Sequence, residues 1–412
     1  MLRWSTVSRL WTVWVLTRAL IVVFIGVTAL PHSIWDGCAA DLGLYREWAG
    51  VFVHQHTFPL ADERWQYPPG AAVVMVAPWL LGAGHAYTWW FFAMVGAADA
   101  GVLGLLIRSV RREGRVASWA GPWVWVLGVA LVGRVLYGRF DLIVAASAVA
   151  ALLWALRRPL AAGVAVAAGV LLKLWPIVVL LGWKRPVLWR MGVSAAVSGA
   201  VMGAALTTIG PGAWSFARFQ SERGLQIEAP ATTPLMIARL IRHSWRITHR
   251  YGAEELLGPG VSAVSHCCVP LTVIGGLILL VVWWRKRPPA PDLALAAVLI
   301  ALTTSRVLSP QYLIWAVAVA AVCALYRSTT QRPIVLLVLV SALLSQVEFP
   351  FVYDKVASGH VVGVIVLLLR NGVLVYATVW SIVRLWRPVD DETRWWNRAL
   401  RTEAPAPVAA VA

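Results

Sequence analysis

Long apolar runs rich in Leu, Val and Ala alternate along the chain with short connections that carry most of the arginines and lysines. A membrane-spanning helix needs about 20 apolar residues, whereas a barrel strand alternates polar and apolar residues over about ten. The runs therefore predict an all-α, polytopic membrane protein. We count about twelve segments, at about residues 10–30, 86–107, 117–136, 142–156, 160–172, 174–183, 191–209, 262–284, 293–304, 312–325, 333–347 and 361–383.

Three stretches depart from this simple pattern. Residues 70–81 are too few to cross the bilayer, so we expect an interfacial or re-entrant helix there. Residues 160–172 and 174–183 should form a hairpin hinged at 173–176, because Pro176 breaks a helix. The long connection 210–260 contains an amphipathic stretch, T-T-P-L-M-I-A-R-L-I-R-H-S-W-R-I-T-H-R-Y-G, which predicts a helix on the membrane surface.

Composition agrees with a membrane protein and excludes a soluble one. Hydrophobic residues make up 60% of the 412 residues and charged residues 13%, against about 25% charged in a soluble domain. The formal charge of +17 lies mainly in short connections, which places these on the cytoplasmic side and gives no reason to expect nucleic acid as a partner. We expect one transmembrane domain over 1–390, a retained first span, and a cytoplasmic, largely disordered tail at 391–412.

This topology gathers polar residues at the outer face, beginning in the loop after the first span. Asp41 is the candidate catalytic base, since an outward-facing membrane transferase needs an acid there; a solvated loop carboxylate is the alternative. His54 and His56 are candidates for substrate or surface contacts, because no third ligand at a fixed spacing supports a metal site. No cofactor is expected.

Cations inside or beside the apolar runs are costly and usually functional. Lys173 is a candidate ligand for an anion, with snorkelling to the headgroups as the alternative. Arg306 and Arg370 could act in the same way, or pair with a carboxylate such as Asp141. Asp99, within a predicted span, could simply bridge two helices.

Several short strings, in order, resemble the C-type polytopic glycosyltransferases (GT-C), and within them the actinobacterial polyprenol-phosphate-mannose-dependent alpha-1,2-mannosyltransferases that extend phosphatidylinositol mannosides. They are D-x-x-x-Y (Asp41, Tyr45), Y-P-P at 67–69, G-x-x-D at 138–141, A-G…L-K-x-x-P (Ala162, Gly163, Lys173, Pro176), R-G-L-Q-I-E at 223–228 and L-S-P-Q-Y-L-x-W at 308–315. The resemblance extends from about residue 35 to 375. One departure is Arg139, where many relatives have a neutral polar residue.

The resemblance implies the GT-C fold with interfacial helices at its outer face, and inverting transfer of mannose from a polyprenyl-phosphate donor to a glycolipid acceptor. Asp41 matches the position of the family's base. In the mechanism that we expect, the intramembrane cations Lys173, Arg306 and Arg370 would bind the donor phosphate. The enzyme would lie in the cell membrane with its active site on the outer (periplasmic) face. The further candidate substrate contacts, from the family strings or from their expected place at the outer face, are Tyr45, His54, His56, Tyr67, Asp141, Gln311, Tyr312 and His360.

Two alternatives remain at this point. A polyprenyl-phosphate arabinofuranose donor would suit the same residues. A lipid-linked sugar flippase or transporter would also contain charges within the membrane, although the two halves show no inverted repeat. The expected partners in every case include membrane lipids.

Overall fold

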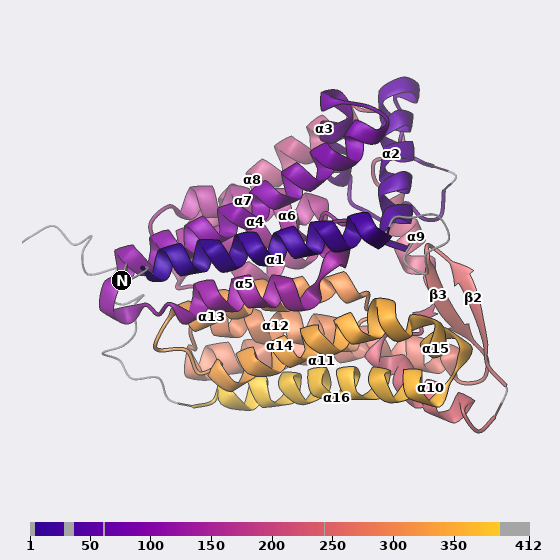
Figure 1. The fold of residues 1–412 in the computed structure, drawn as a ribbon. Coiled ribbons are helices and arrows are strands. Elements are labelled where there is room, and N and C mark those ends of the chain that lie inside the picture. The colour runs from indigo at the N-terminus through magenta and orange to yellow at the C-terminus, as the bar shows by residue number, and fades with distance from the viewer. Residues whose placement is uncertain (1–4, 29–36, 61, 243, 388–412) are drawn as a thin grey trace, which may run out of the picture.

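The computed structural model describes residues 5–28, 37–60, 62–242 and 244–387, and most of them are helical (Figure 1). This bears out the prediction of an all-α membrane fold. The longer helices are α1 (Thr6–Thr28), α2 (Gly37–Gln55), α3 (Ala71–Leu81), α4 (His85–Glu113), α5 (Ala120–Val132), α6 (Asp141–Trp154), α7 (Pro159–Leu172), α8 (Arg185–Thr207), α11 (Val261–Lys286), α12 (Ala290–Thr304), α13 (Leu313–Leu325), α14 (Arg332–Gln346) and α16 (Val361–Arg384). Short helices α9 (Phe216–Glu222), α10 (Thr233–Arg239) and α15 (Tyr353–Ser358) lie between them.

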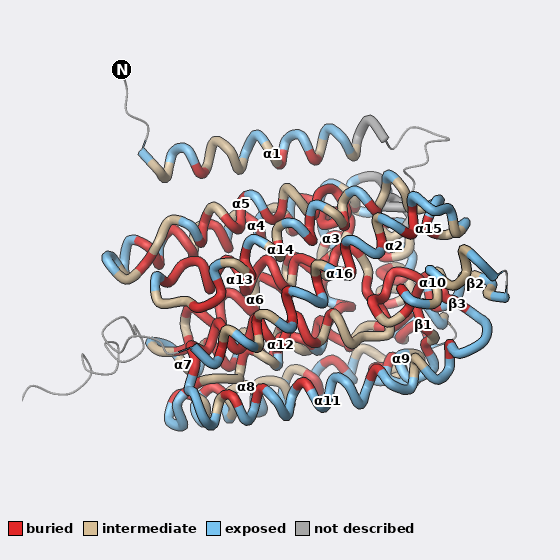
Figure 2. Tube along the Cα trace, turned by 90° about the horizontal axis from the view of Figure 1, so that it is seen from below, coloured by how far each residue is buried: buried red, intermediate tan, exposed pale blue. Residues whose placement is uncertain are grey.

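The apolar helices form a buried centre surrounded by longer helices (Figure 2). Within the described ranges, six helical stretches are long and apolar enough to cross a membrane, and six apolar helices have only 10–17 residues. The short helices α12 and α13 are almost entirely buried, whereas α1, α8 and α11 expose apolar side chains at the periphery. Short helices can be stable at membrane depth when protein rather than lipid surrounds them.

The two ends of the bundle differ in composition. The basic connections meet at one end: Ala117 pairs with Tyr326 in a β-bridge, and Arg157 contacts Glu113 at 3.4 Å. The opposite end carries α2, α9, α10, α15 and a small sheet (Figure 1). A single side of the membrane can therefore hold the basic connections, as the charge pattern predicts.

The small sheet corrects part of the prediction for residues 232–252. Helix α10 ends at Arg239, and the chain then forms β2 (Arg246–Arg250) and β3 (Ala253–Leu257), with β1 (Leu225–Gln226) on the other edge of β3. The hairpin turn consists of Tyr251 and Gly252, with φ values of 52° and 68°. Positive φ at both positions is typical of the tight turn that matches strand twist, and it outweighs the apolar spacing that predicts a continuous helix.

Two other local predictions were also wrong. The stretch after the first span is helical through Gln55, because Leu42, Tyr45, Ala49 and Phe52 recur at helical spacing and are buried. Residues 175–180 form a 3-10 helix of six residues, which is too short to be the membrane segment expected at 174–183.

Asp99 bridges helices, which was one of its expected roles. Its carboxylate accepts hydrogen bonds from Arg18 Nε at 2.7 Å, Trp125 Nε1 at 2.8 Å and Tyr137 Oη at 3.0 Å. Arg18 also donates to the Val126 carbonyl at 2.7 Å. This buried, fully paired charge fixes the peripheral helix α1 to α4 and α5.

Candidate active site

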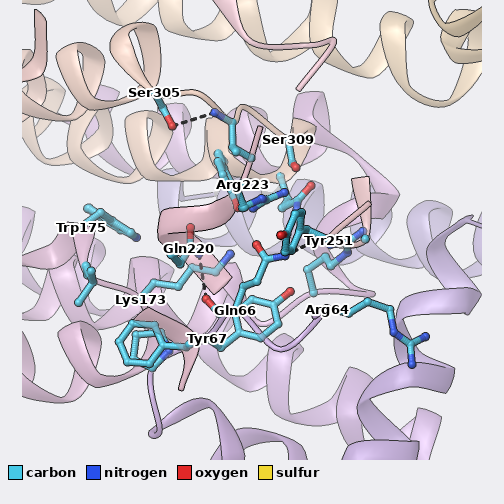
Figure 3. Close-up of a pocket in the computed structure, with 18 of the residues that line it drawn as sticks. Arg64, Gln66, Tyr67, Lys173, Trp175, Gln220, Arg223, Tyr251, Ser305 and Ser309 are labelled. Carbon is cyan, nitrogen blue, oxygen red and sulfur yellow. Dashed lines mark hydrogen bonds between the residues drawn. The ribbon is translucent and has the colours of Figure 1, made fainter. Parts of the chain in front are cut away.

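A cavity of about 390 Å³ lies at the end of the bundle that carries the sheet. Segments far apart in sequence form its walls: α2, residues 64–68, the turn before α6, the chain after α7, α9 with the residues that follow it, the hairpin turn at 251–252 and residues 305–315. Figure 3 labels lining residues from several of these segments. Its lining residues are Asp41, Leu44, Trp48, Arg64, Gln66, Tyr67, Pro68, Arg139, Lys173, Leu174, Trp175, Phe216, Gln220, Arg223, Tyr251, Gly252, Ala301, Ser305, Arg306, Val307, Ser309, Gln311, Tyr312 and Trp315.

Asp41 projects from α2 and forms an ion pair with Arg139, which lies in the turn before α6. Both side chains are mostly buried, with 22% and 21% of their surface exposed. Burial raises the pKa of Asp41 above its ordinary value, and the Arg139 guanidinium opposes that rise. A carboxylate with a raised pKa accepts a proton more readily, so Asp41 is suited to general-base chemistry.

Lys173 reaches the cavity because α7 ends at Leu172 and the next residue is extended, with φ −155° and ψ 139°. Its ammonium donates to Asp141 Oδ1 at 2.7 Å and lies 4.5 Å from the Tyr312 ring centroid. Asp141 is 1% exposed and lies behind the lysine, where the same oxygen accepts from Trp315 Nε1 at 2.9 Å. A carboxylate and aromatic faces thus hold this desolvated cation in place.

The chain before α3 supports this arrangement through Gly70. Its amide donates to the Leu171 carbonyl at 2.9 Å. A Cβ at Gly70 would lie 2.6 Å from that oxygen, so only glycine allows the Y-P-P segment to approach the end of α7 this closely.

Three further arginines line the cavity. Arg306 donates to the carbonyls of Arg223 at 2.9 Å and Gln220 at 3.2 Å, so it fixes the end of α9. Arg64 is held by Asp62 through contacts of 2.8 Å. Arg223 is 8% exposed, and its Nε has no hydrogen-bond partner among the described residues. Buried guanidinium groups with free donors are suited to phosphate.

The lining as described therefore contains five basic side chains and one acidic side chain. Aromatic rings complete the wall: Tyr312 and Trp315 stack with centroids 4.3 Å apart, and Trp175 stacks on Trp315 at 5.4 Å. The arrangement can bind an anion, offer aromatic faces to a sugar, and remove a proton at one point.

The structure brings half of the residues singled out in the sequence to this cavity. Tyr45 and Asp141 lie directly behind the wall; Tyr45 is 1% exposed, with its ring centroid 6.3 Å from that of Tyr67. Those that line the cavity are Asp41, Tyr67, Lys173, Arg306, Gln311 and Tyr312.

The other four do not line it. Arg370 is fully buried, pairs with Glu348 at 3.1 Å and donates to the Glu228 carbonyl at 2.7 Å. His54 packs against Trp79, and His56 follows the end of α2. His360 caps α16, where its Nδ1 accepts from the Val362 amide at 3.2 Å. Sequence spacing could not separate these positions, because all lie near the same end of the bundle.

Sequence reasoning did not select several lining residues. Arg139 and Arg223 belong to the G-R-F-D and R-G-L-Q-I-E strings, so their position within these motifs was a usable signal. Arg64 and Tyr251 carry no such signal, because only the hairpin brings Tyr251 to the cavity.

No group of three or more His, Cys, Asp or Glu side chains within the described ranges is arranged to hold a metal ion.

The model of Glycosyltransferase family 87 matches residues 65–310, which is more than half of the chain. The matched region includes Arg139, Lys173, Arg223 and Arg306, whereas Asp41 precedes it. No curated protein matches the chain.

Proposed function

The chain belongs to glycosyltransferase family 87, and from this membership and the cavity we propose that it transfers mannose from a polyprenyl-phosphate donor to a glycolipid. The proposed product carries an alpha-1,2 linkage, as in phosphatidylinositol mannoside or lipoglycan biosynthesis. One observation carries the proposal: a single described carboxylate, Asp41, lines a cavity together with five basic side chains.

The basic side chains support a donor that contains phosphate. Lys173 and Arg306 remain in the proposed phosphate site, and Arg223 takes the place of Arg370, because Arg370 is paired with Glu348 away from the cavity. A phosphodiester between lipid and sugar bears one negative charge, which the excess of cations would neutralise. When the sugar leaves, the phosphate gains a second charge, which the same groups stabilise more strongly.

The position of the hinge supports a lipid-linked donor. Leu174 lines the cavity and is also 58% exposed, and Ile177 on the following 3-10 turn is 56% exposed. Phosphate bound at Lys173 would thus lie next to an apolar outer surface. A polyprenyl chain can follow that surface among the membrane lipids while its sugar-phosphate occupies the cavity.

The proposed reaction is an inverting displacement. Asp41 accepts the proton of the acceptor hydroxyl, whose oxygen attacks the anomeric carbon. The bond from that carbon to the phosphate oxygen breaks, and polyprenyl phosphate leaves with the bonding electrons. Arg139 orients Asp41 before the acceptor arrives. Since the basic connections lie at the opposite end, we place the cavity on the outer, periplasmic side of the cell membrane.

The direct test uses purified protein in detergent or nanodiscs with polyprenyl-phosphate [³H]mannose and synthetic mannosides, with products resolved by chromatography. The expected result is transfer from this donor and little from polyprenyl-phosphate arabinofuranose offered in parallel. Preference for the arabinofuranose donor would overturn the assigned sugar. Transport of either lipid without a glycoside product would overturn the proposed reaction.

A further inference from the structure

A second hollow, of about 660 Å³, adjoins the cavity. The two share Trp48, Arg64 and Gly252 in their walls. We call this second hollow the α2 groove. It continues away from the cavity between α2 and the segment that follows it, with His249 of the hairpin on its far side.

One face of α2 runs through both hollows. Asp41, Leu44 and Trp48 line the cavity, and Trp48, Val51 and Gln55 line the groove. Their spacing of three or four residues places them on one face of the helix. At a rise of 1.5 Å per residue, Trp48 lies about 10 Å along the axis from Asp41, and Gln55 about 20 Å. The groove therefore leads along the helix to the proposed base.

The two hollows carry opposite charge. The cavity contains five basic side chains and Asp41, whereas the groove contains Glu47, Asp62 and Glu63 and one arginine, Arg64. Asp62 binds that arginine through two contacts of 2.8 Å. A phosphate would be attracted to the cavity and repelled by the groove.

Carboxylates accept hydrogen bonds and donate none, so the groove favours a ligand with many hydroxyl donors and no negative charge. Trp48 lies where the two hollows meet and is 1% exposed, so it forms part of the wall between them and not an open aromatic face. Its indole donates to Asp62 Oδ2 at 2.9 Å, and its ring packs edge-on against Trp65 with centroids 5.2 Å apart. The carboxylates that line the groove match the hydroxyl groups of a saccharide.

We propose that the α2 groove binds the saccharide of the acceptor, an uncharged glycan of more than one sugar, and directs its terminal hydroxyl past Trp48 to Asp41. This rests on the proposed glycosyltransferase function and adds a subsite to it. Donor and acceptor then approach Asp41 from separate hollows, which the difference in charge keeps apart.

The test compares acceptors that reach different distances into the groove. The probes are octyl mannoside, octyl dimannoside and octyl trimannoside, with the labelled donor held at saturation. The groove variants are Glu47→Gln and Gln55→Ala, and the matched control is Asp354→Asn, an exposed acid in α15 that lines neither hollow. We expect both groove variants to raise KM for the trimannoside about tenfold. KM for the monomannoside and KM for the donor should stay within twofold.

Binding of free mannotriose, followed by saturation-transfer NMR, provides a readout that needs no turnover. The groove variants should weaken it, and Asp354→Asn should not. An unchanged KM and unchanged binding for the longer glycan would overturn the subsite even if transfer is normal. A rise in donor KM alone would also overturn it, because the groove would then serve the donor. If mannotriose binding depends on Glu47 but the protein catalyses no transfer, the saccharide site is supported and the proposed reaction is wrong.

Discussion

Replacing Asp41 with asparagine keeps the size and much of the hydrogen bonding of the side chain but removes its ability to accept a proton. If Asp41 is the base, transfer should fall by about 10²–10⁴. Donor binding should change little, since the groups proposed for the phosphate are Lys173, Arg223 and Arg306.

The structure limits how much of this loss could come from misfolding. Asp41→Asn leaves Arg139 without its ionised partner, and removing one partner of a fully buried pair costs about 3–5 kcal/mol. Both side chains here are about one-fifth exposed, so water can solvate the arginine and the cost should be nearer 1 kcal/mol. A loss of unfolding stability of that size lowers Tm only slightly, and it is too small to explain the expected loss of transfer.

Single-turnover transfer from the labelled donor, with Tm and donor Kd measured on the same preparation, separates these effects. Asp354→Asn is the matched control, because this exposed carboxylate in α15 lies outside both hollows. If Asp41→Asn retains more than a tenth of wild-type transfer, Asp41 is not the base. If it loses transfer together with donor binding or fold, the residue has a structural role instead.

Variants of three charged pairs give further tests. Arg139→Gln removes the guanidinium that opposes the rise in the pKa of Asp41, so the acid limb of the pH–rate profile should move to higher pH. Arg139→Lys should move the acid limb less. An acid limb that stays in place in Arg139→Gln contradicts this reasoning. Lys173→Met should raise donor KM about 30-fold, which is equivalent to about 2 kcal/mol. Adding Asp141→Asn should restore unfolding stability but not donor affinity, because it removes the carboxylate that Lys173 leaves unpaired. If the double variant recovers both, Lys173 only neutralises Asp141. Asp99→Asn should lower unfolding stability by about 3 kcal/mol, and Arg18→Met combined with Asp99→Leu should lower it less. Thermal unfolding in detergent measures this, and donor Kd should be unaltered in both proteins. A wild-type Tm for Asp99→Asn would show that the buried pair does not hold α1.

The sequence was most informative where one physical constraint dominates. A segment in contact with lipid must be apolar and helical, so the boundaries of α11 (Val261–Lys286) and α16 (Val361–Arg384) lie within a few residues of the predicted segments. Lys173 was identified for the same reason, because a cation beside long apolar runs requires a partner. The partner itself, Asp141, was considered for other cations and was not assigned to Lys173.

Prediction failed where contacts distant in sequence determine the structure. The hairpin that follows α10 depends on positive φ at Tyr251 and Gly252, and its strand β3 pairs with β1 residues that lie 29 and 31 positions earlier in the chain. Arg370 carries the same sequence signal as Lys173, a cation in an apolar run. Its buried partner Glu348 belongs to another helical segment, and only the folded chain shows that this pair lies away from the cavity.

Arg139 was visible in the sequence, but its role depends on the fold. From the sequence it was a departure from the family pattern in a short turn, and its effect could not be assigned. In the fold that turn lies opposite α2, so the added charge acts on Asp41 itself. A base paired with arginine is ionised more readily than an equally buried carboxylate alone, but it is also a weaker proton acceptor.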